Sequence, residues 1–451
     1  MTAIRVFRKY DNRASGEIFG HPRALAYLFA TEMWERFSYY GMRALLVLYM
    51  LKFLFTSQRT SEVVGLESLQ SALEFAFGPL APQPLASQIY GFYTGLVYLT
   101  PILGGLLADR LLGQRRTVIV GATVMAIGHF LMAFEQLFLI ALGFLILGNG
   151  AFKPNISTQV GSLYPPGDRR RDRAFSIFYV GINLGAFLAP LVCGTLGEEL
   201  GWHYGFTAAG IGMTLGLVIY LIATPHLPSD AFVRRVPNGG LDGSAWRSII
   251  ALFLLFVPVS LFWATYEQQG NTITLWADQF TDRHFVGSEI PVTWFQAFNP
   301  FMIFAFTPFI VAFWRRQEKN EPSTIAKLAI GCAINAFAYL VMVAAAWIAG
   351  GEKASWFWLF VFFVIITVGE LYLSPTSLSL VTKIAPRSLL SMMMGVWLAT
   401  SFVGGFLAGY LGTFWSTMDK SNFFLMLALI SLASGIAIAL LRVPLRSVLR
   451  D

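Results

Sequence analysis

The sequence is poor in charged residues. Asp, Glu, Lys and Arg make up 13% of its 451 residues, whereas hydrophobic residues make up 56% and the mean hydropathy is +0.62. A water-soluble protein cannot bury so large an apolar fraction, so the composition indicates a polytopic membrane protein. The apolar runs are long and unbroken rather than alternating, which excludes a closed β-barrel.

Cysteine and histidine are also scarce. Cys193 and Cys332 fall in separate apolar runs, so we expect free thiols and no disulfide. Of the five histidines, only His129 falls inside such a run. The sequence has no His/Cys cluster with metal-ligand spacing and no nucleotide-binding glycine loop, so we expect no enzyme, no catalytic residue, no metal and no cofactor. The first twenty residues are polar and basic, so we expect no cleavable signal peptide.

The apolar runs predict an all-α membrane protein with twelve transmembrane helices in two six-helix bundles. The expected spans are residues 23–54, 87–108, 115–134, 136–158, 173–197, 205–224, 247–276, 293–314, 324–348, 355–383, 388–414 and 421–441. The polar break after the sixth span predicts a linker. The expected order is a cytoplasmic N-terminal segment (1–22), an N-terminal bundle (23–227), the linker (228–246), a C-terminal bundle (247–441) and a cytoplasmic tail (442–451).

Lys and Arg are distributed unevenly about these spans. When the loops are assigned alternately to two sides, 24 of the 32 fall on the side of both termini, 5 fall on the opposite side and 3 fall inside spans. Cytoplasmic loops carry the excess of Lys and Arg. The bias therefore predicts cytoplasmic termini in a multi-pass cell membrane protein. It also attributes the net charge of +7 to membrane topology and not to a nucleic-acid partner.

The first span carries more charge than a lipid-facing helix tolerates. It contains Glu32, Glu35, Arg36 and Arg43, and each charge at the bilayer centre costs about 2.5–3.5 kcal/mol on insertion scales. Glu32, Arg36, Tyr40 and Arg43 are spaced by 4, 4 and 3 residues, so they form one helical stripe that must face protein or water. The stripe is either a structural ion-pair cluster or part of a proton and substrate path.

Four further spans carry polar candidates. Lys153 lies beside Pro154 in the middle of span four. It is either a buried functional lysine or one whose side chain snorkels to the membrane interface. Asn183 in span five can serve a site or simply bond a neighbouring helix. Glu267 in span seven and Glu370 in span ten must pair or take up a proton when buried.

The seven deep charges comprise four carboxylates and three cations, so one acid can be protonated in some state. Arg43 and Lys153 lie in the first half and Glu267 and Glu370 in the second, so pairs across the halves can act as gates. The same groups suit a zwitterion, with the cations on its carboxylate and Glu370 on its ammonium. Candidate aromatic residues of the pocket wall are Tyr39, Tyr40, Tyr98, Trp263 and Trp397.

Two sets of motifs resemble known families. Residues 104–116, with Asp109 and Arg110, resemble the cytoplasmic loop signature of the major facilitator superfamily, in which halves rock about a central site. Four further blocks resemble the proton-coupled oligopeptide transporters of that superfamily. These blocks are Glu32-x-x-Glu35-Arg36-Phe37-Ser38-Tyr39-Tyr40-Gly41, Phe152-Lys153-Pro154-Asn155, Phe178-Tyr179-x-x-Ile182-Asn183-x-Gly185 and Glu370-Leu371-Tyr372-Leu373-Ser374-Pro375.

The resemblance implies proton-driven uptake of di- and tripeptides. It assigns proton coupling to Glu32, Glu35, Arg36, Lys153 and Glu267. It assigns the peptide carboxylate to Arg43 and Lys153, and the peptide amine to Glu370, Asn183 and Asn299. It gives pocket positions to Tyr40, Tyr98, Trp263, Ser374 and Trp397. It makes Arg43–Glu267 the outer gate pair and Lys153–Glu370 the inner one.

Some features depart from the pattern. The linker is too short for the two extra helices of many bacterial members, and Tyr266 stands where some members have a second acid. The alternative function is a related major facilitator transporter of nitrate, a drug or another small metabolite. We expect peptides, protons and the lipid bilayer as partners and a monomer, although the sequence does not determine the oligomeric state.

Overall fold

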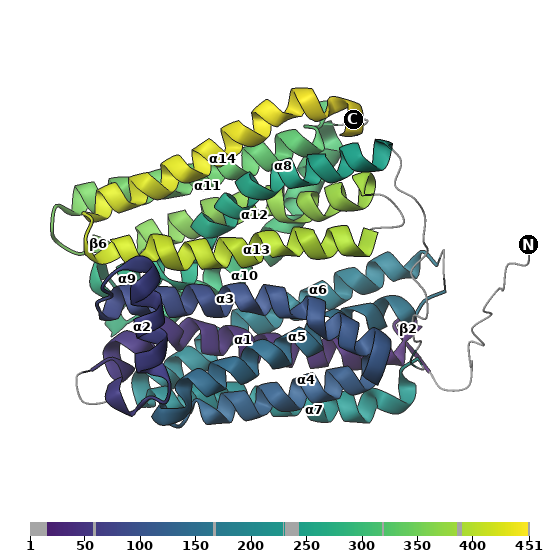
Figure 1. Cartoon of the computed structure of the whole chain (residues 1–451), viewed down its shortest axis with the longest axis horizontal. Helices are drawn as coiled ribbons and strands as arrows, with labels where there is room; N and C mark the ends of the chain where they lie inside the picture. Colours follow the sequence, from purple (N-terminus) through teal and green to yellow (C-terminus); the bar gives the residue numbers. More distant parts are fainter. Residues whose placement is uncertain are drawn as a thin grey trace, which may run out of the picture.

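The structure is a computed structural model that describes residues 16–56, 60–165, 168–228, 230, 243–317, 320–385 and 390–449. Long helices run side by side through the molecule (Figure 1). In this view the helices of the first half of the chain, α1 to α7, lie in the lower part, and those of the second half, α8 to α14, lie in the upper part. The all-α prediction is confirmed.

The first half contains α1 (Arg23–Tyr49), α2 (Leu66–Phe77), α3 (Pro82–Leu107), α4 (Gln114–Leu131), α5 (Phe138–Ser162), α6 (Arg170–Ala189) and α7 (Trp202–Ala223). The second half contains α8 (Gly243–Tyr266), α9 (Thr272–Gln279), α10 (Phe298–Gln317), α11 (Thr324–Ala349), α12 (Phe357–Ile384), α13 (Leu390–Gly412) and α14 (Lys420–Leu449). Short turns with altered helical geometry extend several of them, at residues 50–54, 108–112, 190–194, 267–270 and 292–297.

Six two-residue strands form three small pairs in the loops. The pairs are antiparallel β1 (Glu17–Ile18) with β2 (His21–Pro22), parallel β3 (Thr281–Asp282) with β6 (Ala354–Ser355), and antiparallel β4 (His284–Phe285) with β5 (Ser288–Glu289). They fasten loops at the two ends of the helices and form no core of their own.

Ten described helical segments are long and apolar enough to cross a membrane. The other two expected spans correspond to α1 and α4, which pack within the same set of helices, α1 against α6 and α7 and α4 against α5 and α7. α1 carries five charged residues, Arg23, Glu32, Glu35, Arg36 and Arg43, which is why its composition alone does not mark it as a membrane span. The count of twelve therefore stays a prediction. Most of the expected linker, 229 and 231–242, lies outside the described residues, and α14 continues past the expected end of the last span.

Helices meet backbone to backbone at several glycines, and two of these places bear on the site. Between α3 and α5, a Cβ atom on Gly104 would lie 2.0 Å from the carbonyl oxygen of Gly150, so only glycine fits there. Between α3 and α13, a Cβ atom on Gly91 would lie 2.5 Å from the Cα atom of Gly409. We call this second place the glycine contact; it joins the first half of the chain to the second.

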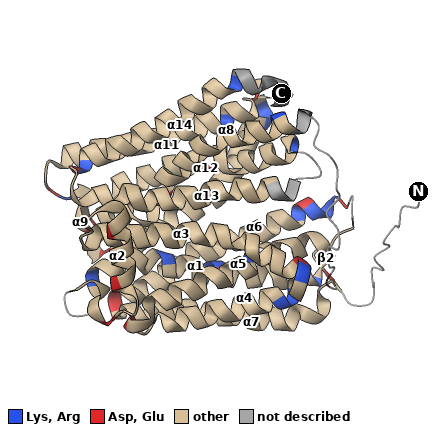
Figure 2. Ribbon diagram, viewed as in Figure 1, with Lys and Arg blue, Asp and Glu red and all other residues tan. Residues whose placement is uncertain are grey.

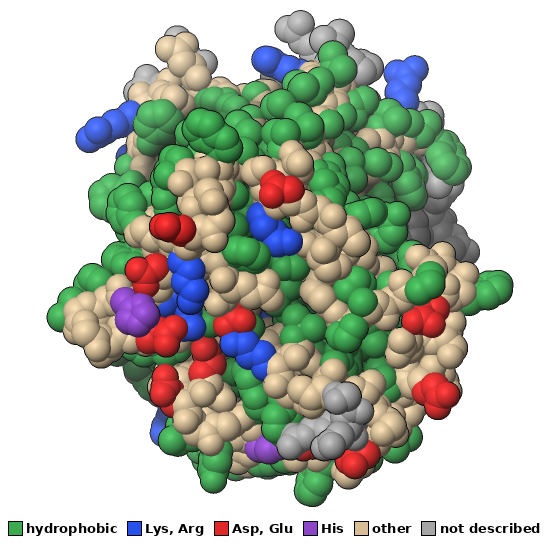
Figure 3. Space-filling view, turned by 90° about the vertical axis from the view of Figure 1, so that its left-hand side faces the viewer, with side chains coloured by type: hydrophobic (Ala, Val, Ile, Leu, Met, Phe, Trp, Pro, Cys, Tyr) green, Lys and Arg blue, Asp and Glu red, His purple; other side chains and the backbone are tan. Residues whose placement is uncertain are grey.

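Charged side chains gather at the two ends of the helices and leave the middle mostly apolar. Lys and Arg concentrate at the end where both termini lie (Figure 2). The opposite end, which carries α2 and α9, shows Asp and Glu among hydrophobic side chains, with a few Lys and Arg (Figure 3). Cys193 and Cys332 are buried free thiols, as the sequence predicts.

Candidate functional site

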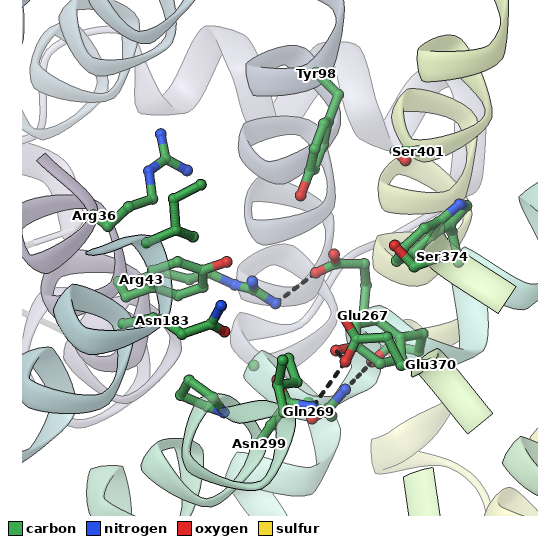
Figure 4. A pocket seen from close by; sticks show the side chains of 18 of the residues that line it. Arg36, Arg43, Tyr98, Asn183, Glu267, Gln269, Asn299, Glu370, Ser374 and Ser401 are labelled. Carbon is green, nitrogen blue, oxygen red and sulfur yellow. Dashed lines mark hydrogen bonds and ion pairs between the residues drawn. The ribbon is translucent and has the colours of Figure 1, made fainter. Parts of the chain in front are cut away.

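A cavity of about 370 Å³ lies between the two halves. Polar and charged side chains from both halves face into it, although it lies deep among apolar helices (Figure 4). Its wall includes Glu32, Arg36, Tyr40, Arg43, Tyr98, Lys153, Asn183, Trp263, Tyr266, Glu267, Gln269, Gln296, Asn299, Glu370, Ser374, Ser377, Trp397 and Ser401. Buried charges are costly in a protein of this composition, so the cavity is the candidate functional site.

The α1 stripe lies along one wall of this cavity. Glu32, Arg36, Tyr40 and Arg43 all line it, as their helical spacing requires. Glu32, Arg36 and Arg43 are each at most 9% exposed, so their charges are held away from bulk water. The stripe therefore faces protein and cavity and not lipid.

Arg36 holds the two acids of its own helix. Its Nε atom lies 2.5 Å from Glu35 Oε2 and 3.3 Å from Glu32 Oε1, and its Nη2 atom lies 2.7 Å from Glu35 Oε1. The amide of Asn149 on α5 donates to Glu35 Oε1 at 3.2 Å. Both carboxylate oxygens of Glu35 therefore accept hydrogen bonds. Glu32 keeps one buried oxygen, Oε2, with no hydrogen-bond partner among the described residues.

Arg43 reaches across to the second half. Its Nη2 atom lies 2.5 Å from Glu267 Oε2, and its Nε atom donates to the hydroxyl of Tyr90 at 3.0 Å (Figure 4). The Tyr90 hydroxyl in turn donates to the backbone carbonyl of Glu267 at 3.3 Å. Arg43 and Glu267 are both buried, so breaking this pair would leave a costly unpaired charge.

Glu370 lies in the opposite wall and is held by neutral groups. Its Oε2 atom accepts a hydrogen bond from the Tyr266 hydroxyl at 2.5 Å and another from the Asn299 amide at 3.0 Å (Figure 4). The Asn299 amide also donates to the hydroxyl of Thr367 at 3.1 Å. Within the described chain, no cation forms an ion pair with Glu370.

Lys153 lies in the wall without a carboxylate partner among the described residues. Its Nζ atom lies 4.9 Å from the ring centroid of Tyr98, which offers the cation an aromatic face. The Lys153–Glu370 pair that the resemblance implies is therefore not made in this structure. Of the two implied gate pairs, Arg43–Glu267 alone is formed among the described residues.

Most residues expected at the site line the cavity, but two do not. Tyr39 is buried against Tyr40, at 5.1 Å between ring centroids, and beneath the Arg36 guanidinium, so the cavity wall does not include it. Glu35 lies behind Arg36 and is likewise absent from the wall. The expected assignment of Tyr39 to the pocket wall is wrong because Tyr39 is turned by about 100° from Tyr40 around the helix and faces away from the cavity.

Several residues of the site could not be predicted from the sequence. Tyr90 and Asn149 bind the charged residues from α3 and α5, and Gln269 and Gln296 add amides to the wall. Glutamines beside Glu267 were visible in the sequence. The partners of Arg43 and Glu35 depend on how helices cross, which no local pattern records.

Hydrogen bonds and ion pairs close the end of the cavity that bears α2 and α9. We call them the outer seam. They join Lys52 to Asp278 at 2.5 Å, Ser87 to Asn271 at 3.0 Å, Gln83 to the carbonyl of Gly412 at 3.0 Å, and the backbone amides of Val292 and Thr293 to Glu198 at 2.9 and 2.8 Å. Each pair links the first half of the chain to the second.

The signature loop follows α3 at the opposite end. Asp109 and Arg110 lie in its helical turn at residues 108–112, and no hydrogen bond or ion pair joins either to another described residue. The carboxylate at the start of α4 belongs instead to Asp230, which accepts from the backbone amide of Arg115 at 3.0 Å. The Arg115 side chain also donates to the carbonyls of Pro228 and Leu227. The loop is thereby fastened to the end of span six.

Two bundles of membrane-capable helices around a shared charged cavity define a membrane transporter of the major facilitator fold. The sequence pattern of the POT family matches residues 115–236 and 241–429. The chain therefore belongs to the POT family.

Similar proteins support this assignment. The chain is 35% identical to a peptide transporter, YePEPT, of Yersinia enterocolitica subsp. palearctica, over 87% of this chain and 88% of that protein. It is 31% identical to a di-/tripeptide transporter of Lactococcus lactis subsp. cremoris, over 98% and 99%. A crystal structure of a peptide transporter POT in complex with sulfate superposes with a TM-score of 0.85 at 30% identity, over 97% of this chain and 98% of that chain.

Proposed function

We propose that this protein imports di- and tripeptides together with protons by alternating access. One observation carries the proposal: the cavity places cations on one wall and a carboxylate on the other (Figure 4). Arg43 and Lys153 face Glu370 with its donors Tyr266 and Asn299. A short peptide is a zwitterion whose carboxylate and ammonium are separated by its backbone, so it matches this division of charge.

The cavity offers different groups to the two ends of a peptide. Lys153 has no carboxylate partner among the described residues, so its ammonium is available to a peptide carboxylate, and Arg43 can share its remaining donors. Glu370 keeps one oxygen, Oε1, without a described donor, so it is available to a peptide ammonium. Trp263, Tyr40 and Trp397 supply apolar surface for varied side chains. The names of the relatives above support the same substrate class.

Proton coupling is assigned to the acids around Arg36. Glu32 Oε2 is buried without a donor, and an ionised oxygen in that position is costly, so a proton on Glu32 would relieve it. Release of that proton would strengthen the attraction of Glu32 for Arg36 and Lys153. Glu267 and Glu35 complete the set of groups that exchange partners during the cycle.

Alternating access follows from the two gate pairs. The outer pair Arg43–Glu267 is formed here and the inner pair Lys153–Glu370 is not, so this state is closed at the outer seam. We infer that the opposite state breaks the first pair and forms the second. The excess of Lys and Arg at the end bearing the termini supports a cytoplasmic location for that end, in a cell membrane.

Uptake into proteoliposomes tests the proposal. An imposed proton gradient should drive accumulation of dialanine in the parent protein. Lys153→Ala should abolish gradient-driven accumulation but retain part of counterflow exchange, because exchange needs no net proton movement. Lys383→Ala is the matched control, since this lysine lies outside the cavity and its Nζ atom donates to Thr324 at 3.4 Å.

Two outcomes contradict the proposal. Normal accumulation by Lys153→Ala would refute the coupling assignment. Failure of di- and tripeptides to compete with any transported solute, with nitrate or a drug transported instead, would favour the alternative function.

A further inference from the structure

Tyr266 contacts Glu370 in a way that its position in the sequence does not suggest. Its hydroxyl donates to Glu370 Oε2 at 2.5 Å, across the gap between α8 and α12. Asn299 donates to the same oxygen at 3.0 Å. Both donors therefore act on one carboxylate oxygen, and Oε1 is left as the acceptor that faces the cavity without a described donor.

The two hydrogen-bond donors, Tyr266 and Asn299, stabilise the charged form of Glu370 in place of a cation. A buried carboxylate needs donors that favour its charged form, and hydrogen bonds to an ionised acceptor are about twice as strong as neutral ones. No cation lies within ion-pair distance of Glu370 among the described residues, so its charge and orientation depend on Tyr266 and Asn299. The Tyr266 ring is fixed in turn by stacking on Phe262, with 5.7 Å between centroids.

Tyr266 and its neighbour in the chain serve different walls. Tyr266 binds Glu370, whereas Glu267 binds Arg43 at 2.5 Å. A rotation of this part of α8 that breaks the outer pair would also move the hydroxyl away from Glu370.

We propose that Tyr266 is a positioning residue that sets selectivity for a free α-amino group. The inference rests on the proposed function, because it assumes that Glu370 receives a peptide ammonium. The hydroxyl orients the carboxylate so that Oε1 points into the cavity, and a blocked amine gains nothing from that orientation. A site built to bind one polar group discriminates strongly against analogues that lack it.

The experiment compares Tyr266→Phe with the parent in proteoliposomes. The KM for dialanine should rise about tenfold with maximal rate unchanged, in line with loss of one hydrogen bond to a charged group. The inhibition constant of N-acetyl-dialanine, which has no ammonium, should stay the same. In a Glu370→Gln background, Tyr266→Phe should add no further effect.

Tyr339→Phe is the matched control. Its buried hydroxyl donates to the backbone carbonyl of Thr265 at 2.6 Å, so the variant removes a hydrogen bond to α8 one residue away without touching Glu370. Its KM for dialanine should equal that of the parent. Tyr266→Phe keeps the ring and its stacking on Phe262, so the variant removes the hydroxyl alone and should fold as the parent does.

Three results overturn the inference. The first is an unchanged KM for dialanine. The second is an equal loss for dialanine and its N-acetyl derivative, which would mean general damage to the pocket. The third is an undiminished effect in the Glu370→Gln background. A parent protein that does not transport dialanine at all would instead refute the proposed function, and the inference with it.

Discussion

Replacing Gly104 by alanine is expected to push α3 away from α5, whereas the same change at Gly105 is expected to be harmless. A Cβ atom at Gly104 would lie 2.0 Å from the carbonyl oxygen of Gly150 and 2.8 Å from the Cα atom of Ala151. A carbon and an oxygen in contact keep about 3.3 Å, so the helices must separate by roughly 1 Å. At Gly105 nothing lies within 4 Å of the added atom.

The two variants differ only in this clash. In both variants, alanine stabilises the helix by about 1 kcal/mol relative to glycine through its higher helix propensity. Overpacking costs about 1–3 kcal/mol, and a backbone clash belongs at the upper end because no side chain can rotate away. The free energies of unfolding should therefore differ by about 3 kcal/mol. For a chain of this size, that corresponds to about 3 °C in the midpoint of thermal unfolding.

Thermal unfolding in detergent, followed by tryptophan fluorescence, measures the difference. Gly104→Ala should also reduce uptake, because α3 carries Tyr98 and α5 carries Lys153, whose contact spans 4.9 Å. Gly105→Ala should melt at or slightly above the parent temperature and transport normally. Equal midpoints for the two variants would refute the argument from the helix contact.

Two further predictions concern the outer seam and the loop before α6. Glu267→Gln leaves the Arg43 charge buried without its partner, at a cost of about 3–5 kcal/mol, so the outer seam should open. A thiol introduced by Ser87→Cys should then react faster with a membrane-impermeant maleimide, and an unchanged rate would contradict this. Hydrogen bonds from Arg170 lower the pKa of Asp168, so their contribution to local stability is present above the ordinary aspartate pKa near 4 and is lost as pH falls through the lowered value. The protection factors of the amides at residues 168–173, which correct for the intrinsic pH dependence of hydrogen exchange, should therefore fall on acidification in the parent protein but not in Asp168→Asn, and equal pH dependence in both would refute it.

Much of the fold could be read from periodicity because the bilayer restricts the choices. The expected span at 324–348 matches α11, Thr324–Ala349, since a polar break bounds each end of an apolar run. The spacing of the charges was enough to predict that the α1 stripe faces protein or water, because charges cannot face lipid. Local helix geometry determines both results.

Contacts between helices could not be predicted in this way. Nothing in the sequence pairs Tyr266 with Glu370 or Asn149 with Glu35, since the residues are far apart in the chain and meet only after the helices cross. The carboxylate that accepts from the start of α4 likewise belongs to Asp230, beyond span six, and no local pattern pairs it with Arg115. Several residue types suit such positions, and only tertiary packing selects among them.

The glycine contact between α3 and α13 sets how closely the two halves of the chain can approach. Gly91 and Gly409 bring the two backbones together, and Phe92 packs beside them on Phe406 with 5.1 Å between ring centroids. Because glycine has no side chain, contact at this point orders no rotamer of either residue, so little side-chain entropy is lost there. A methyl group at either position would hold the two helices apart and leave a gap where the halves now touch.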